Sequence, residues 1–85
     1  LTALILAAKN GHLEAVERLL AAGANVSTAR SDGWTALISA ANGGHLSVVQ
    51  RLVEAGANLE EADCDGWTPL FVAAKNGHLA TVEWL

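Results

Sequence analysis

The hydrophobic positions along the chain recur at the spacing of short amphipathic helices. In the middle of the sequence, Leu46, Val49 and Val53 lie at i, i+3 and i+7, a spacing that places them on one face of a helix. Another apolar stripe lies just before them, over residues 37–41. The middle of the chain is therefore predicted to form two short helices in succession.

Capping and turn residues bound these two helices. Thr35 is a good N-cap, because its hydroxyl can accept a hydrogen bond from a free backbone amide. Gly44 is predicted to end the first helix and Gly56 the second, since glycine adopts the left-handed backbone found at helix ends. Asp32-Gly33 and Asp65-Gly66 give tight-turn signals, so a hairpin is expected before each of two first helices.

The whole pattern returns at an interval of 33 residues. Trp34-Thr35-Ala36-Leu37 recurs as Trp67-Thr68-Pro69-Leu70, and one interval earlier the chain reads Leu1-Thr2-Ala3-Leu4. Gly-His pairs at 11, 44 and 77 and Ala-Ala pairs at 7, 40 and 73 keep the same register. The predicted first helices lie near residues 2–10, 35–43 and 68–76, and the predicted second helices near residues 12–22, 45–55 and 78–85.

Neither helix of a pair can be stable alone, because isolated helices shorter than about 12–15 residues are marginal in water. The pairs must therefore stack on neighbouring pairs, with Val49 and Leu52 buried between the helix layers. We expect an all-α array over residues 1–85, with repeats at 1–31 and 32–64 and a partial repeat at 65–85.

These motifs resemble the ankyrin repeat over the whole chain. The residues that carry the resemblance are Gly33-Trp34-Thr35-Ala36-Leu37, Ala40-Ala41, Gly44-His45-Leu46, Val49, Leu52-Val53 and Gly56-Ala57-Asn58. The resemblance implies a right-handed solenoid of L-shaped helix-turn-helix units joined by β-hairpin loops. It also implies that hairpin tips and first helices line a concave face that binds proteins, with second helices on the convex back.

The sequence departs from the family pattern at several positions, and two of these departures change what we expect. The histidine that usually follows Thr-Pro-Leu is replaced by Ile5, Ile38 and Phe71, so we expect apolar packing to stabilise that layer. The usual hairpin aspartate is present as Asp63 but is replaced by Arg30 one period earlier. The hairpin that contains Arg30 is therefore expected to be held less firmly.

Charge and cysteine content narrow the class of protein. The net charge is −4, which argues against nucleic acid as a partner because phosphates favour a basic surface. The single cysteine, Cys64, allows no internal disulfide and favours a reducing intracellular compartment, the cytoplasm or the nucleus. No apolar run approaches the roughly 20 residues that span a bilayer, so membrane insertion is not expected.

The repeated histidines and the cysteine carry no enzyme or metal site in our interpretation. His12, His45 and His78 recur at helix junctions, and stacked helices about 8–10 Å apart cannot easily bring them to one metal ion. Cys64 has acidic neighbours, which raise a thiol pKa. We read it as an ordinary free thiol, and we predict no cofactor and no catalytic residue.

Trp34 and Trp67 are the most interesting candidates for binding, because each follows a turn glycine and tryptophan is enriched in interface hot spots. Either each ring anchors a partner or it packs on the next hairpin. The full set of candidate partner-binding residues is Trp34, Trp67, Ser31, Asp32, Cys64, Asp65, Asn42, Lys75 and Asn76. An acidic run from Glu60 to Asp65 favours a basic partner.

Three functions compete. The first is a protein-interaction module whose partner lies on the concave face. The second is a structural spacer inside a longer solenoid, which wholly buried tryptophans would favour. The third is a reader of methylated ammonium groups through cation–π attraction to Trp34 and Trp67. Because the apolar residues Leu1, Leu4, Val82 and Leu85 lie near the ends, flanking repeats are expected to be needed for a stable monomer.

Overall fold

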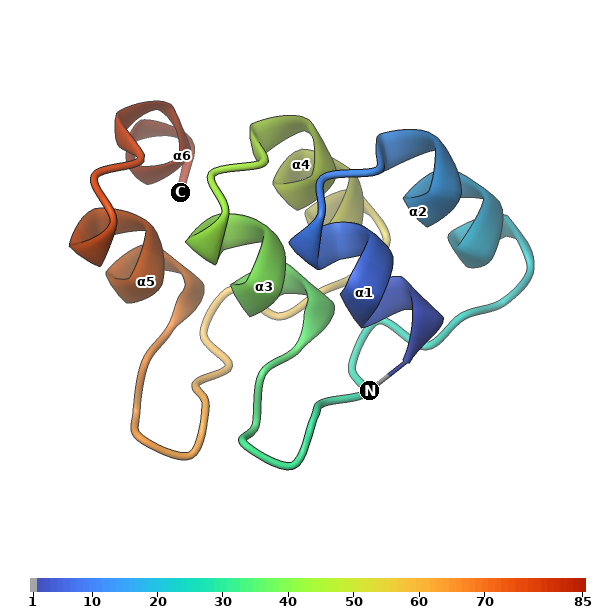
Figure 1. Ribbon diagram of the computed structural model, residues 1–85, viewed down its shortest axis with the longest axis horizontal. Coiled ribbons are helices and arrows are strands. Elements are labelled where there is room, and N and C mark those ends of the chain that lie inside the picture. The colour runs from blue at the N-terminus through green and yellow to red at the C-terminus, as the bar shows by residue number, and fades with distance from the viewer. Residues whose placement is uncertain (1) are drawn as a thin grey trace.

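Three helix pairs lie side by side in the computed structural model, which describes residues 2–85 (Figure 1). The molecule measures 32 × 25 × 19 Å along its principal axes. The first helices are α1 (Ala3–Lys9), α3 (Ala36–Asn42) and α5 (Pro69–Lys75), and the second helices are α2 (Leu13–Ala21), α4 (Leu46–Glu54) and α6 (Leu79–Trp84). All six coincide with the predicted segments, which confirms the all-α solenoid of stacked helix pairs.

Each first helix begins at a threonine cap. The hydroxyl of Thr35 accepts a hydrogen bond from the amide of Ile38 at 3.2 Å, and Thr2 and Thr68 cap α1 and α5 in the same way. Pro69 occupies the first turn of α5, where the missing amide hydrogen costs nothing. The caps satisfy amides that short helices would otherwise leave free.

The turn between the two helices of a pair requires glycine for two reasons. Gly44 has a φ of +71°, and a Cβ atom there would lie 2.5 Å from Nδ1 of His78. Side chains rarely adopt that backbone conformation, and the histidine ring of the next repeat already fills the space. The Gly-His pairs therefore serve the turn within one repeat and the contact between two.

The hydrophobic core runs through the stack and is densest in the middle repeat. Every residue from Ala36 to Ala41 in α3 is buried, because α1 packs on one side of this helix and α5 on the other. The second helices form a parallel layer in which Val49 and Leu52 are fully buried, as expected. Alanines at 40 and 41 keep the first helices close together.

Two hairpins project from the helical layers on the side of the first helices (Figure 1). The first hairpin (residues 29–35) closes with a bridge between Ala29 and Thr35 and a hydrogen bond of 2.9 Å from the amide of Arg30 to the carbonyl of Trp34. In the second hairpin (residues 62–68), the amide of Asp63 donates to the carbonyl of Trp67, also at 2.9 Å. Within residues 2–85, no helix has both the length and the apolar content that crossing a membrane requires.

We expected apolar packing at all three residues that replace the family histidine, and this expectation is wrong at one of them. Ile5 and Ile38 are buried, but Phe71 at the equivalent position is 55% exposed, because no further helix of the described chain covers that side of α5. Near the ends, Leu4 is buried at 3% exposure, whereas Leu6 is 47% exposed. Leu1 lies outside the described residues. Val82 and Leu85 are partly buried against the core.

Truncating Leu52 to alanine is expected to destabilise the fold by about 2–5 kcal/mol, because the side chain leaves a cavity between the helix layers. The matched control is Leu79→Ala in α6, where the leucine is 69% exposed and the expected loss is within about 0.5 kcal/mol. Chemical denaturation of both variants measures the difference. A loss below about 1 kcal/mol for Leu52→Ala would contradict the burial described here.

Candidate protein-binding surface

Trp34 stands at the end of the first hairpin, immediately before the cap of α3, and links the two hairpins. Its ring is partly buried against the core, and its indole Nε1 donates a hydrogen bond of 2.8 Å to Oδ2 of Asp63 in the second hairpin. The ring therefore packs on the next hairpin and also keeps part of its surface exposed. The interpretation that the ring packs on the next hairpin is confirmed, and its use as an anchor for a partner stays a prediction.

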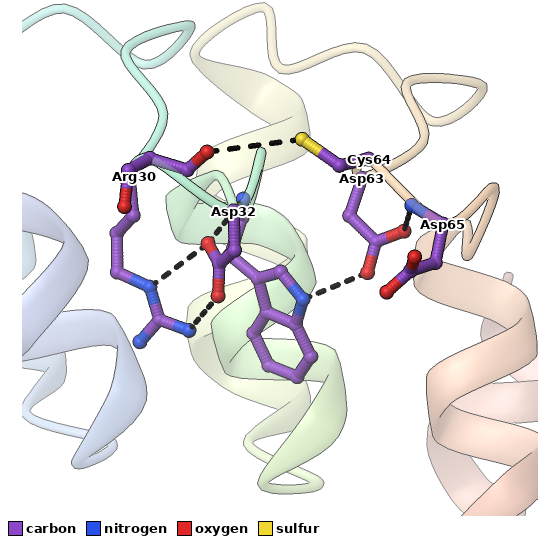
Figure 2. A network of polar contacts seen from close by, with 7 residues as sticks. Arg30, Asp32, Asp63, Cys64 and Asp65 are labelled. Carbon is purple, nitrogen blue, oxygen red and sulfur yellow. Dashed lines mark hydrogen bonds and ion pairs between the residues drawn. The ribbon is translucent and has the colours of Figure 1, made fainter.

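Asp63 organises the second hairpin and joins it to the first (Figure 2). Its Oδ1 accepts from the amides of Asp65 at 2.8 Å and Trp67 at 2.9 Å, while Oδ2 accepts from Trp34. Desolvation acts to raise the pKa of Asp63, but the hydrogen bonds from Trp67, Asp65 and Trp34 outweigh it, so the pKa lies below its ordinary value. Asp63 is consequently held as a carboxylate at neutral pH.

The first hairpin, which lacks this aspartate, is fastened by an ion pair instead (Figure 2). Arg30 donates to both oxygens of Asp32, at 3.3 and 2.7 Å, and Oδ1 of Asp32 accepts from the amide of Trp34 at 3.0 Å. The hydrogen bond to Asp32 raises the pKa of Arg30, and the same bond lowers the pKa of Asp32 against an opposing effect of desolvation. The looser hold on this hairpin stays a prediction.

Backbone contacts at the hairpin tips hold the two hairpins together. The amide of Cys64 donates to the carbonyl of Asp32 at 3.0 Å, and the thiol of Cys64 donates to the carbonyl of Ser31 at 3.8 Å. A Cβ atom on Gly33 would lie 2.8 Å from the amide nitrogen of Cys64, so glycine permits this close approach. The tips therefore form a continuous edge that carries the exposed side chains of Asp32 and Asp65.

Trp67 occupies the position equivalent to Trp34 but is 37% exposed. Its ring meets Phe71 edge-on, with centroids 6.2 Å apart, and Nζ of Lys75 lies 5.1 Å from its centroid. Within residues 2–85, its indole N–H has no counterpart to Asp63. Trp67 therefore presents more aromatic surface than Trp34 does.

Two of the repeated histidines, His45 and His78, form hydrogen bonds between consecutive repeats. This fits the structural role predicted for them. Nε2 of His45 lies 3.1 Å from the carbonyl oxygen of Lys9, and Nε2 of His78 lies 2.8 Å from that of Asn42. Because a carbonyl oxygen only accepts, Nε2 of each ring carries the proton. Asn76 adds hydrogen bonds from its Nδ2 to the carbonyl and side-chain oxygens of Asn42, at 3.2 and 2.6 Å.

A hollow of about 380 Å³ opens between the first hairpin and the ends of α1 and α3. It is lined by Lys9, Arg30, Trp34, Ser39, Asn42 and Gly43. The guanidinium of Arg30 lies 5.1 Å from the centroid of Trp34, and the buried hydroxyl of Ser39 has no hydrogen-bond partner among the described residues. The lining of the hollow thus combines an aromatic ring, two cationic groups and an amide.

Comparison with known families agrees with this geometry. A family model of ankyrin repeats, in three copies, matches residues 1–85. The chain belongs to the ankyrin-repeat family. Ankyrin repeats are in general protein–protein interaction modules and not enzymes. A comparison with curated proteins gave no match.

The ankyrin stack distributes the nine candidate residues over three places. Ser31, Asp32, Cys64 and Asp65 lie at the hairpin tips, although Ser31 and Cys64 contact each other there. Trp34 and Asn42 line the hollow, whereas Trp67, Lys75 and Asn76 lie one repeat further along. Within residues 2–85, no group of three or more histidine, cysteine or acidic side chains is placed to hold a metal ion.

The repeat pattern alone does not reveal the contacts of Arg30 and the burial of the Ser39 hydroxyl. Arg30 stands in place of the usual hairpin aspartate, yet it pairs with Asp32 and lies over the ring of Trp34. The sequence feature that indicates this ion pair is the opposite charge of Asp32, two positions after Arg30. For Ser39, the sequence feature is a hydroxyl within an otherwise apolar helix face.

Asp63→Ala is expected to lower the melting temperature at pH 7 by more than the matched control Asp65→Ala, because only Asp63 accepts bonds from both hairpins. The folded-state pKa of Asp63 is lowered from an ordinary value of 3.8. Its contribution is therefore complete well above pH 3.8 and is lost as the pH falls through the folded-state pKa. Thermal melts of both variants against wild type from pH 7 to pH 2 test this. A difference that persists unchanged at the lowest pH would contradict the role of the ionised carboxylate.

Proposed function

We propose that this ankyrin stack binds a protein partner across the surface formed by its hairpins and first helices. The observation that carries the proposal is the fixed, partly exposed placement of the two tryptophans on that surface. Trp34 is held by Asp63 and Arg30, and Trp67 by Phe71 and Lys75. Aromatic side chains that are already ordered lose little entropy on binding, which makes them efficient anchors.

The hollow beside Trp34 supports the same proposal. It lies between two first helices and a hairpin, so one partner side chain could contact Lys9, Asn42 and the indole ring together. An extended peptide or a helix laid along the stack would then reach Trp67 in the next repeat, since equivalent positions recur at about 10 Å. The hollow beside Trp34 and the exposed ring of Trp67 would then contact two different side chains of one partner.

The hairpin tips support a basic partner. Asp65 is exposed there, and Glu60 and Glu61 lie on the same connection, whereas the charge of Asp32 is offset by its ion pair with Arg30. Asp63 adds less to the negative charge available to a partner than its position in the acidic run suggests, because its oxygens accept hydrogen bonds within the protein. Surface charges of this kind steer association more than they add affinity.

A spacer within a longer solenoid is the second candidate. The exposed apolar side of α5 favours it, since Leu70 and Phe71 are 41% and 55% exposed. Against it, neither tryptophan is wholly buried. The third candidate, a reader of methylated ammonium groups, is disfavoured because Arg30 and Lys75 already lie over Trp34 and Trp67.

Replacing Trp67 with alanine is expected to weaken partner binding by about 2 kcal/mol or more, near 30-fold in Kd, because an exposed anchor is lost. Trp34→Phe, which keeps an aromatic ring but loses the indole N–H, should have a smaller effect. The control is Arg18→Ala on the back of the stack, where the arginine side chain is 80% exposed and pairs with Glu14.

Affinity capture from cell extract with wild type, Trp67→Ala and Arg18→Ala identifies the partner, and titration of each folded variant then measures Kd. Circular dichroism establishes that the variants are folded. Binding that survives Trp67→Ala but is lost with Arg18→Ala would place the partner on the second helices. Binding insensitive to every variant would also overturn the proposed site, whereas capture of no partner by wild type would favour the spacer.

Asp65→Asn is expected to slow association with that partner and to reduce its dependence on salt, because one steering charge at the hairpin tips is removed. Dissociation should change little. Stopped-flow association rates at several salt concentrations test this, with Glu14→Gln on the back as the control. A faster association after Asp65→Asn would indicate an acidic partner instead.

A further inference from the structure

The hollow beside the first hairpin gathers cationic side chains in a chain that is acidic overall. Its lining residues come from α1, the first hairpin and α3, so it lies between two repeats of the described chain. The net charge is −4 and the chain has five lysine and arginine residues, of which two, Lys9 and Arg30, line this hollow. Among the described residues that line it, none is acidic.

The charge of the hollow corresponds to about one uncompensated cation. Arg30 forms an ion pair with Asp32, with 2.7 Å between Nη2 and Oδ2, so its charge is largely offset. Lys9 is exposed and forms no salt bridge among residues 2–85. A group with a single negative charge therefore balances the hollow, whereas a phosphate group, with a charge of about −1.5 to −2, exceeds what Lys9 can balance.

The polar groups that remain available in the hollow are hydrogen-bond donors. Oδ1 of Asn42 accepts from Nδ2 of Asn76 at 2.6 Å, so the amide nitrogen of Asn42 is the group left to bind a ligand. Nε and Nη2 of Arg30 donate to Asp32, and the ammonium group of Lys9 can only donate. A ligand that accepts several hydrogen bonds matches this set.

Ser39 adds a donor that the fold itself does not use. Its side chain is 2% exposed, and its Oγ has no hydrogen-bond partner among the described residues. The equivalent residues of the neighbouring repeats are Leu6 and Val72, which are apolar. An unsatisfied buried hydroxyl destabilises a fold, so packing alone does not explain a serine here. An acceptor that enters the hollow and bonds to this hydroxyl removes the penalty.

Trp34 contributes an apolar wall to the hollow. Its indole N–H already donates to Oδ2 of Asp63 at 2.8 Å, so the ring is what remains for a ligand. The guanidinium of Arg30 lies 5.1 Å from the ring centroid and keeps this wall beside a positive charge. The combination favours an anionic group carried on a short apolar stem, because a bare ion leaves the ring without a contact.

The equivalent place in the next repeat lacks this chemistry. Asp63 stands there at the position of Arg30, and Val72 stands at the position of Ser39. The carboxylate of Asp63 disfavours an anion, and Val72 offers no hydroxyl. The chain therefore has one such site, although its repeats share the same backbone.

We propose that the hollow binds one carboxylate of the partner, carried on an apolar stem as in a glutamate side chain. The carboxylate accepts hydrogen bonds from Lys9, Asn42 and the Ser39 hydroxyl. The stem packs on the ring of Trp34. The inference rests on the proposed function for the source of this group. The partner then presents one acidic residue to the hollow and basic residues to the hairpin tips.

The test uses a single glutamate that is blocked at both ends, so that the side-chain carboxylate is its only charge. In NMR spectra of ¹⁵N-labelled protein, the side-chain amide of Asn42 reports on the hollow, and the indole N–H groups of Trp67 and Trp84 report on other surfaces. Blocked glutamate should shift the Asn42 signals saturably, with a Kd of about 1–10 mM as expected for so small a ligand. The two indole signals should not move.

Blocked glutamine is the matched ligand control, because it has the same shape without the charge. It should bind about 10-fold more weakly, or worse, since hydrogen bonds to charged groups are the stronger ones. N-acetylalanine carries its carboxylate at the chain terminus. If it binds more tightly than blocked glutamate, the carboxylate comes from the end of the partner chain and not from a side chain.

Ser39→Ala separates a binding role from a structural one. Loss of an unsatisfied hydroxyl should leave the melting temperature unchanged or raise it, while affinity for blocked glutamate falls about 3- to 10-fold. Lys9→Gln should remove the preference for glutamate over glutamine. Arg18→Gln on the back of the stack changes the net charge equally and should leave that preference unchanged.

Equal shifts with blocked glutamate and blocked glutamine would overturn the proposal, as would the lack of any saturable shift at Asn42 in the millimolar range. Tighter binding of inorganic phosphate would also overturn it, in favour of a phosphate site. So would a Ser39→Ala variant that loses stability and keeps its affinity. The proposed function is tested separately: a captured partner that needs Trp67 but tolerates Lys9→Gln and Ser39→Ala retains that function and removes this inference.

Discussion

The structure depends on burial of one helix pair against the next. Its first helices have only seven residues each, too few to be stable in isolation, so their stability comes from neighbours on either side. The middle helix α3 shows the result, with all residues from Ala36 to Ala41 buried. Small side chains at Ala40 and Ala41 are what allow this, because they let helix backbones approach on both sides.

Hydrogen bonds between repeats fix the relative position of the helix pairs that pack together. Hydrophobic packing alone is non-directional, whereas the bonds from His45 to Lys9 and from His78 to Asn42 fix how one pair sits on the next. The hairpins are aligned in the same way by the bond from Trp34 to Asp63. Each contact joins one repeat to the following one, so the surface along the first helices and hairpins is held as a unit.

The surface that we propose for partner binding holds its aromatic side chains in place through contacts within the protein. Arg30 makes two such contacts, since it forms an ion pair with Asp32 in the hairpin and lies over one side of the Trp34 ring.

The sequence by itself determined the six helices, their threonine caps, the glycine turns and the structural use of the histidines, because these depend on local backbone chemistry and on a strict 33-residue register. Only the tertiary structure separated residues that the repeat makes equivalent. Trp34 donates to Asp63 while Trp67 is exposed, and Ile38 is buried while Phe71 is not. The physical reason is that exposure in a stack depends on the next repeat, and position within a repeat carries no information about whether a neighbour covers it.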